Sequence, residues 1–370
     1  MNVYTGEIWK QEQRWGNPLH QTPYFGCFGP ALANYIIDRF TEPGQIVYDP
    51  FAGRGTVPLE AVLMGREGIW RESNLYARAL LHGKMWLAAA RDYQALSEEI
   101  YKALEFIRTD ACEELGDDCL YEWDEKGLLN FFDPYVAYEL EKIRFWCQKM
   151  WPGTSTSHII QMVVATILTG HSPGYLSVRT LPPNQQIQPD RQALLNQKHG
   201  NKPEDKNVYQ LIWQRFERYI KAGPPQTQTL MQEYQTHPCM GAHLILTSPP
   251  FLDVIDYEKI NWIRNWWLGG SLFSLWHEQD VKAWQLQMWR WMREWAQQLH
   301  PDGFLCIEAG KVRKGKVDLI ELIIKLAPRA GFVPEELFLQ QTSHTRTARC
   351  WGVDSDQGTT SQQVICLKLA

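Results

Sequence analysis

The sequence lacks the long apolar runs and the leader pattern that membrane-spanning or exported proteins carry. No stretch of its 370 residues approaches the roughly 18 consecutive apolar residues of a bilayer-spanning helix, and no signal-peptide pattern opens the chain. Hydrophobic residues make up 44% and charged residues 21%, values typical of a globular protein in water. We therefore expect a cytoplasmic protein with one large domain that carries an insertion, or with two domains.

Patterns for metal ligands and for nucleotide triphosphates are missing as well. The eight cysteines include no Cys-x-x-Cys pair and no histidine at ligand spacing, so we expect reduced thiols and no metal site. The glycine-rich stretch Asp49–Thr56 is not followed by Gly-Lys-Ser/Thr. That absence disfavours a P-loop.

Negative charge prevails slightly and is unevenly distributed. The formal net charge of −5 argues mildly against a protein that coats nucleic acid without specificity. Residues 85–150 hold seven Lys/Arg against fifteen Asp/Glu, a net charge of −8, whereas residues 151–225 hold eight against four, a net charge of +4. A surface that faces phosphate groups, if the protein has one, should lie in the second block.

The N-terminal part contains a strand, a glycine-rich loop and a helix in succession. The strand ends at Asp49 and leads into the loop DPFAGRGT, which predicts the first unit of a doubly wound α/β sheet. Gly53 and Gly55 have no Cβ, so the backbone can turn tightly and approach a ligand closely. Glu72 follows the next strand, expected near Glu67–Arg71, where a carboxylate can accept from ribose hydroxyls. A surface carboxylate is the alternative for Glu72.

A second stretch, Leu244–Phe251, is an apolar strand that ends in Thr-Ser-Pro-Pro-Phe. Pro249 and Pro250 have no backbone N–H and a restricted φ, so they make a stiff segment that presents carbonyl oxygens. With the Ser248 hydroxyl, these acceptors suit an exocyclic amino group, whose two hydrogens must be held while its nitrogen attacks. Phe251 offers a flat face for a planar base. This stretch is the candidate reaction centre; the simpler alternative is a strand that ends in a rigid turn.

Together the two stretches resemble the motifs of S-adenosylmethionine-dependent DNA amino-methyltransferases of the SPPF/SPPY type. In that family the loop reads roughly Asp-Pro-Phe-x-Gly-x-Gly-Thr and the catalytic tetrapeptide [Asp/Asn/Ser]-Pro-Pro-[Tyr/Phe/Trp]. The resemblance implies methyl transfer from S-adenosyl-L-methionine to the exocyclic amine of a base flipped out of DNA. The implied catalytic residues are Ser248, Pro249, Pro250 and Phe251, and the implied cofactor-binding residues are Tyr24, Asp49, Pro50, Phe51, Ala52, Gly53, Gly55, Thr56 and Glu72.

The resemblance also implies separate roles within the cofactor site. Asp49 would lie close to the methionine end and Glu72 would hold the ribose. The segment before the loop would close over the methionine moiety, with Tyr24 or Phe28 as contacts. Glu72 stands where aspartate is more usual, and Leu75 stands where Asn-Pro is common. These two departures bear only on the ribose contacts.

For the fold, the resemblance implies a Rossmann-like class I methyltransferase of the α/β class. We expect a mostly parallel seven-stranded sheet with an antiparallel C-terminal edge hairpin and a mainly helical or irregular insertion. Residues 1–84 would form the cofactor-binding half of the catalytic domain and residues 241–370 the catalytic half. Residues 85–240 would be the insertion, the candidate region for target recognition.

Within the insertion, residues 84–107 and 134–151 have the apolar spacing of helices. Gly170–Pro203 is rich in Pro, Gly, Asn and Gln, which predicts an ordered irregular segment; it is similar to a segment in a subgroup of SPPF-type methyltransferases. By side-chain chemistry, candidates for nucleic-acid contacts are His171, Ser172, Arg179, Asn184 and Gln185 there, Asp253, Asp256 and Tyr257 after the tetrapeptide, and Arg346 and Arg349 near the C-terminus. A solvated side chain is the alternative for each.

The first residue of the tetrapeptide bears on the target base. Serine at position 248 resembles the cytosine-N4 subgroup, so we prefer cytosine N4 over adenine N6. An RNA base is the next alternative, although no appended RNA-binding module is recognisable, and a non-catalytic DNA-recognition subunit is the last. DNA is the expected partner and a membrane is not. The sequence leaves open whether a cognate restriction endonuclease accompanies the protein in a restriction-modification system.

Overall fold

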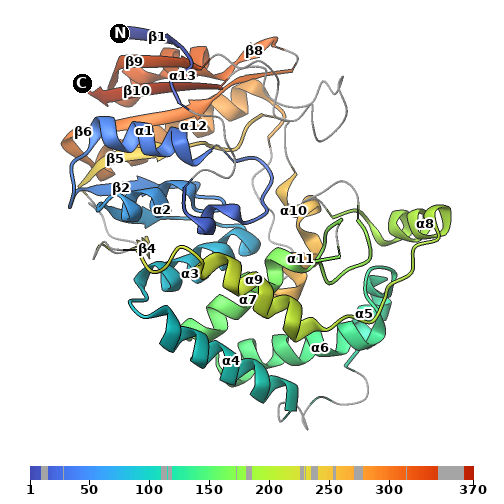
Figure 1. The fold of residues 1–370 in the computed structure, drawn as a ribbon. Coiled ribbons are helices and arrows are strands. Elements are labelled where there is room, and N and C mark those ends of the chain that lie inside the picture. Colours follow the sequence, from blue (N-terminus) through green and yellow to red (C-terminus); the bar gives the residue numbers. More distant parts are fainter. Residues whose placement is uncertain are drawn as a thin grey trace.

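The structure, a computed structural model, is organised around an eight-stranded mixed sheet (Figure 1). It describes residues 1–9, 16–27, 29–109, 115, 119–171, 173–180, 186–225, 229, 231–234, 241–252, 256–270, 278–313, 315–340 and 362–370. In their order across the sheet the strands are β1 (Asn2–Gly6), β9 (Phe332–Gln340), β10 (Gln362–Leu369), β6 (Leu299–Ala309), β5 (Ala242–Thr247), β2 (Ile46–Asp49), β3 (Glu67–Trp70) and β4 (Met231–Glu233).

Strand direction brings the ends of several strands to one edge of this sheet. Neighbouring strands run parallel except at β10, which is antiparallel to both β6 and β9. β2 lies between β3 and β5 and is parallel to both. The carboxyl ends of β2, β3, β5 and β6 therefore share one edge, which is where open α/β sheets bind their ligands.

Both faces of the sheet are covered by helices, as the alternation of side chains along a strand allows. Leu244 and Leu246 of β5 belong to a buried cluster with α1 (Pro30–Phe40) and α2 (Thr56–Leu63). Ile245 points to the other face and belongs to a cluster with α12 (Val281–Gln298) and α13 (Leu319–Ala330). The long apolar strands of the sheet centre are thus buried on both sides, as parallel strands require.

A helical region lies below the sheet in Figure 1 and has its own buried core. Trp70 and Leu80 join this core to the sheet. The helices of the region are α3 (Leu75–Ala89), α4 (Tyr93–Thr109), α5 (Tyr121–Glu125), α6 (Pro134–Phe145), α7 (Ser155–Ile167), α8 (Pro189–His199) and α9 (Val208–Ile220), and α10 (Tyr257–Ile260) and α11 (Trp262–Trp267) connect it to the end of β5.

The predicted Rossmann-like α/β fold is confirmed, with one strand more than expected. β1 pairs in parallel with β9, outside the hairpin of β9 and β10, so the hairpin does not form the edge of the sheet. Tyr4 of β1 stacks on Phe338 of β9 at a centroid separation of 5.0 Å, a contact between residues too distant in sequence for any local pattern to indicate.

Two local predictions for the helical region need correction. The helix expected over residues 84–107 is interrupted at Ala90–Asp92, where α3 ends and α4 begins. The side chain of Asp92 accepts from the backbone N–H groups of Gln94 and Ala95, which starts the second helix. The segment Gly170–Pro203, expected to be irregular, contains α8, which Pro189 opens and Gly200 closes at a positive φ.

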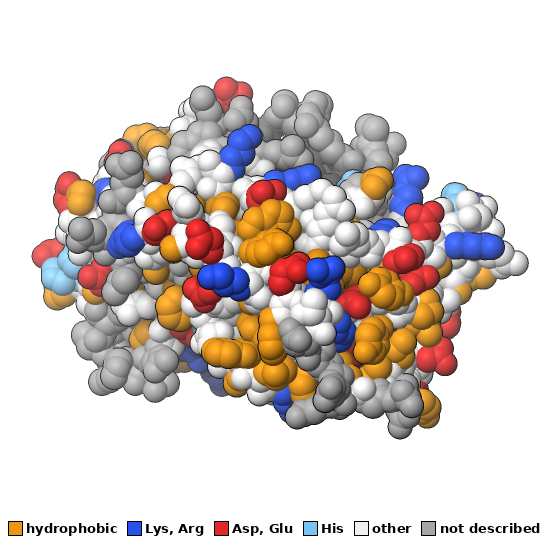
Figure 2. Space-filling view, turned by 60° about the horizontal axis from the view of Figure 1, so that its bottom comes forward, with side chains coloured by type: hydrophobic (Ala, Val, Ile, Leu, Met, Phe, Trp, Pro, Cys, Tyr) orange, Lys and Arg blue, Asp and Glu red, His pale blue; other side chains and the backbone are white. Residues whose placement is uncertain are grey.

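The outer surface of the helical region carries mixed side chains. Figure 2 shows hydrophobic side chains there, interspersed with acidic and basic ones. In the described helices no segment is both long and apolar enough to span a membrane. Large hydrophobic side chains that are exposed in these helices include Tyr101, Phe106, Tyr121 and Tyr135.

Candidate functional site

The two sequence motifs meet at the tips of adjacent strands. β2 ends at Asp49 and β5 ends at Thr247, and the strands are paired in parallel through Tyr48 and Ile245. The Thr247 hydroxyl donates a 2.7 Å hydrogen bond to Asp49 Oδ1. One direct bond therefore joins the glycine-rich loop to the segment that starts the tetrapeptide.

Asp49 organises the beginning of the loop. Its Oδ1 also accepts from the backbone N–H of Phe51 at 3.1 Å. Burial raises the pKa of Asp49 to about 7, although the hydrogen bonds from Thr247 and Phe51 oppose that rise because they stabilise the ionised form. A cationic group placed beside Asp49 would favour its ionised form further.

The two glycines of the loop are required for different physical reasons. Both have positive φ, +50° at Gly53 and +80° at Gly55. A Cβ at Gly53 would come 3.3 Å from the Tyr24 ring, on the side of the candidate site. A Cβ at Gly55 would come 2.6 Å from Leu81 Cδ2 of α3. The missing side chain of Gly55 thus allows Leu81 of α3 to pack against the loop, whereas the missing side chain of Gly53 leaves space beside the Tyr24 ring.

Glu72 lies just past the end of β3 and accepts three backbone hydrogen bonds. Gly53 N–H donates to Oε2 at 2.7 Å, and the N–H groups of Ser73 and Asn74 donate to Oε1 at 2.8 and 2.9 Å. Burial raises the pKa of Glu72, and these hydrogen bonds oppose the rise. Two carboxylate oxygens offer about four acceptor positions, so Glu72 can accept from a ligand as well.

Two tyrosines face each other above the loop. The Tyr24 and Tyr257 rings lie 6.0 Å apart at an interplanar angle of 21°. Asn74 Nδ2 donates to the Tyr24 hydroxyl oxygen at 3.3 Å, and burial raises the pKa of both tyrosines. Tyr24 is one of the two predicted contacts from the segment that precedes the loop; Phe28, the other, lies outside the described residues.

A cavity of about 100 Å³ brings the two motifs together. It is lined by predicted residues from both, and Pro50, Gly55, Pro249 and Phe251 are not part of its lining. Its walls come from the segments that follow β2, β3 and β5, from the segment before α1 and from α10, so neither motif alone would form it. The lining residues are Tyr24, Gly26, Cys27, Asp49, Phe51, Ala52, Gly53, Thr56, Glu72, Ser73, Asn74, Ser248, Pro250 and Tyr257.

Ser248 has a hydrogen-bond partner that sequence reasoning missed. Its Oγ donates to Glu308 Oε2 at 2.7 Å, and Glu308 Oε1 accepts from Gln362 Nε2 at 3.3 Å. Thr247 is paired with Ile307 of β6, so the next residue of each strand, Ser248 and Glu308, falls side by side. Glu308 is only 8% exposed. Because the hydroxyl hydrogen is used on Glu308, the lone pairs of Ser248 Oγ stay available to accept.

Residues of α12 contact one proline and one aromatic residue of the two motifs, Pro250 and Phe51. The indole N–H of Trp284 donates to the Pro250 carbonyl at 3.0 Å. Phe51 packs edge-on against Trp291 at 4.7 Å between centroids, and Phe251 is partly buried in the same cluster. Phe251 does not line the cavity in this structure, and its role as a stacking face for a base remains a prediction.

Buried charged side chains form hydrogen bonds with residues of the glycine-rich loop and with each other. Lys84 of α3 donates to the Arg54 carbonyl, and Arg54 Nε donates to Thr56 Oγ1 at 3.1 Å. The His20 Nε2 and Glu60 Oε1 atoms lie 2.5 Å apart in the same layer. Burial lowers the pKa of Lys84. The Lys84–Arg54 and His20–Glu60 contacts join separate elements, so no sequence motif indicates them.

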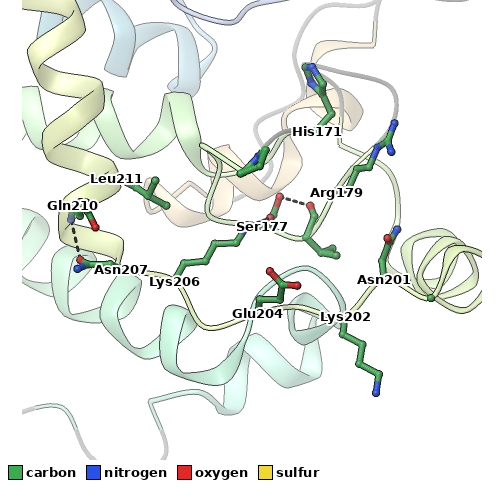
Figure 3. A pocket seen from close by; sticks show the side chains of 13 residues that line it. His171, Ser177, Arg179, Asn201, Lys202, Glu204, Lys206, Asn207, Gln210 and Leu211 are labelled. Carbon is green, nitrogen blue, oxygen red and sulfur yellow. Dashed lines mark hydrogen bonds between the residues drawn. The ribbon is translucent and has the colours of Figure 1, made fainter.

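Other candidate contacts have different placements. Asp256 Oδ1 accepts from Lys259 N–H at 3.0 Å and caps α10, so it serves that helix. His171 and Arg179 line a second cavity, of about 590 Å³ (Figure 3). In the described part of the chain, no group of three or more His, Cys, Asp or Glu could hold a metal ion. Ser172, Asn184, Gln185, Asp253, Arg346 and Arg349 lie outside the described residues.

One comparison with known protein families matches the N-terminal part of the chain. The DNA methylase family model matches residues 2–83, which include the glycine-rich loop and Glu72 and end well before the tetrapeptide. The match covers less than a quarter of the chain and supports methyltransferase activity.

Similar solved structures include two of the rRNA methyltransferase aviRa from Streptomyces viridochromogenes. Both share 10% sequence identity with this chain and cover 95% of it and 89% of the aviRa chain, with TM-scores of 0.35 and 0.34. A search of curated proteins finds no match.

Proposed function

We propose that the protein is an S-adenosylmethionine-dependent DNA methyltransferase that methylates the exocyclic amine of a flipped base, cytosine N4 in the first place. The observation that carries the proposal is one cavity that contains Asp49, Gly53 and Glu72 on one side and Ser248 and Pro250 on the other. The cavity thus places the residues proposed for the methyl donor next to those proposed for the acceptor amine, and such positioning is the main requirement of a transfer between two bound molecules.

The residues around the glycine-rich loop fit the donor. Glu72 would accept from the ribose hydroxyls, and Asp49, at the strand tip, would face the cationic methionine end. The missing Cβ of Gly53 leaves room beside Tyr24, where a side chain would come within 3.3 Å of the ring. The bound cofactor would supply an electrophilic methyl group on a sulfonium. The protein's own residues would bind the substrate amine and orient it toward that methyl group.

Ser248 and the adjacent proline carbonyls would accept hydrogen bonds from the substrate amine. An exocyclic amine is a weak nucleophile because its lone pair is delocalised into the ring. Ser248 Oγ would accept one of its hydrogens, since Glu308 already takes the serine's own hydrogen. The carbonyl of Pro249, which lies between the two lining residues Ser248 and Pro250, would accept the other. This arrangement turns the nitrogen lone pair away from the ring. The base must leave the duplex to reach the site, and Tyr257 at the cavity rim offers an aromatic face for it.

The direct test is labelled methyl transfer to mixed-sequence DNA, followed by digestion to nucleosides. We expect label in N4-methylcytosine, and we expect Ser248→Ala to lower the rate of labelling. Label in N6-methyladenine would overturn the base assignment. Label only in RNA would overturn the DNA assignment, and label in neither polynucleotide would overturn methyl transfer and favour the DNA-recognition subunit.

A further inference from the structure

We propose that the 590 Å³ cavity in the helical region is a second nucleotide-binding groove that holds the DNA strand beside the methylated base. The inference rests on the proposed function, because it assigns a second binding surface to the same substrate. The cavity has the size of pockets that hold small ligands. It lies in the block of the chain that carries a net charge of +4, next to a block that carries −8.

The charged side chains that line this groove are mainly cationic. Arg179, Lys202 and Lys206 contribute positive charge, and among its described lining residues Glu204 is the one carboxylate. Figure 3 shows His171 and Arg179 on one rim and Lys202 on the opposite rim, with Asn201 between them. Two rims with a cation on each suit two successive phosphates of one strand, because cations neutralise phosphate groups and release their counterions.

Amide side chains complete the groove. Asn201, Asn207 and Gln210 line it beside the cations. Asn207 caps α9 by accepting from Gln210 N–H at 3.0 Å, so the N-terminal end of α9 faces the groove. The positive end of a helix dipole favours an anion there, and side-chain amides can hydrogen-bond to base edges or sugars.

The groove is held in shape by its own residues before any ligand binds. Lys206 Nζ donates to the carbonyls of Tyr175 and Ser177, both at 2.7 Å, which ties the linker after α8 to the loop that carries Arg179. Val178 N–H donates to the Phe131 carbonyl at 2.7 Å and anchors that loop on the helical core. A preformed groove loses less free energy on binding than a loop that must first be ordered.

A continuous set of contacts joins the groove to the candidate active site. α10 begins with Tyr257, which lines the active-site cavity. In α11, the Ile263 N–H donates to Gln186 Oε1 at 2.7 Å. The Arg264 guanidinium donates at 3.3 Å to the carbonyl of Thr169, two residues before His171 of the groove lining. Buried hydrogen bonds of α11 thus link the segments that carry the groove to the helix pair that begins at Tyr257.

The test measures DNA binding by wild type and by an Arg179→Ala/Lys202→Ala double variant. Fluorescence anisotropy with a labelled mixed-sequence duplex is recorded from low to high salt. We expect weaker binding by the double variant. We also expect the slope of log affinity against log salt to be smaller by about 1 for each phosphate group that the variant no longer neutralises. Unchanged affinity for S-adenosylmethionine and an unchanged Tm would show that the fold and the cofactor site are intact.

The matched control is Arg191→Ala/Lys198→Ala, which removes the same two charges from exposed positions of α8 outside the groove lining. Equal losses of DNA affinity in both double variants would overturn the groove, since the loss of positive charge alone would then explain them. Wild-type affinity and salt slope in the Arg179→Ala/Lys202→Ala variant would overturn it as well. Methyl transfer is measured in parallel. A wild type that methylates DNA while the groove variant binds normally refutes only the groove. A wild type without transfer whose DNA binding needs Arg179 and Lys202 refutes only the proposed activity.

Discussion

Ser248 Oγ and Glu308 Oε2 are joined by a 2.7 Å hydrogen bond in which the serine hydroxyl donates. The bond fixes the direction of the serine hydrogen, and so decides what Ser248 can offer to a substrate. A hydroxyl that already donates to a carboxylate is left as an acceptor. The tetrapeptide owes this property to a residue on the neighbouring strand.

Glu308→Gln should therefore impair turnover more than cofactor binding. The amide can donate to Ser248, which would turn the serine hydrogen toward the substrate amine and remove the acceptor. We expect kcat to fall about 10-fold to 100-fold, the cost of a misdirected reacting group, with the Kd for S-adenosylmethionine little changed. Steady-state methylation and calorimetry measure the two quantities. Glu335→Gln, on the exposed side of β9, is the control and should behave as wild type.

Thr247→Val should shift the pH dependence of cofactor binding. The pKa of Asp49 is raised to about 7, and the Thr247 hydroxyl opposes that rise. If the ionised carboxylate faces a cationic group of the cofactor, affinity is highest above pH 7 and decreases as pH falls through 7. Removing the hydroxyl raises the pKa further, so the decrease should occur at higher pH in the valine variant.

The control for this prediction is Thr247→Ser, which keeps the hydroxyl and should keep the wild-type midpoint. Titration calorimetry from about pH 5.5 to about pH 9, in buffers of different ionisation enthalpy, reports both the affinity and the proton released on binding. Identical pH profiles for the valine and serine variants would refute the role of the Thr247–Asp49 bond.

Gly53→Val and Ser248→Ala should have opposite effects on binding and turnover. Valine at a φ of +50° is strained, and its side chain would enter the space beside Tyr24. We expect cofactor affinity to fall about tenfold or more, which corresponds to about 1.4 kcal/mol, whereas Ser248→Ala should lower kcat and leave that affinity nearly unchanged. Equal effects of the two variants on both quantities would show that the cavity is not divided between donor and acceptor.

Gly55→Ala should lower stability through a clash with Leu81, beyond the cost of its backbone angle. Gly44 has a similar φ, +85°, with no atom within 4 Å of an added Cβ, so Gly44→Ala isolates the backbone cost of about 1–2 kcal/mol. At Gly55 the clash with Leu81 Cδ2 at 2.6 Å should add about 1–3 kcal/mol. Urea unfolding of both variants measures the difference.

A double-mutant cycle checks the source of that extra cost. In a Leu81→Ala background, Gly55→Ala should cost little more than Gly44→Ala, because the clashing methyl group is gone. An extra cost that persists without the Leu81 side chain would assign it to another neighbour.

Local patterns were enough to predict the strand–loop–helix unit at Asp49–Thr56 and the rigid segment after β5. Pro249 and Pro250 restrict the backbone wherever they occur, and glycines at positive φ are a local requirement. The break between α3 and α4 and the presence of α8 were missed. Asp92, which caps α4, lies inside a stretch whose apolar spacing indicates one continuous helix. Pro189 and Gly200, at the two ends of α8, lie inside a stretch whose composition indicates an irregular segment.

The sequence alone determined which residue types carry the chemistry: an acceptor-rich turn at Ser248–Pro250, a loop without side chains at two positions, and a carboxylate after the second strand. Only the tertiary structure decided that β2 and β5 are neighbours, that Glu308 receives the hydrogen of Ser248, and that Gly55 makes room for Leu81. The physical reason is that backbone stiffness and hydrogen-bonding capacity belong to single residues. Strand order and register arise from the packing of segments far apart in the chain.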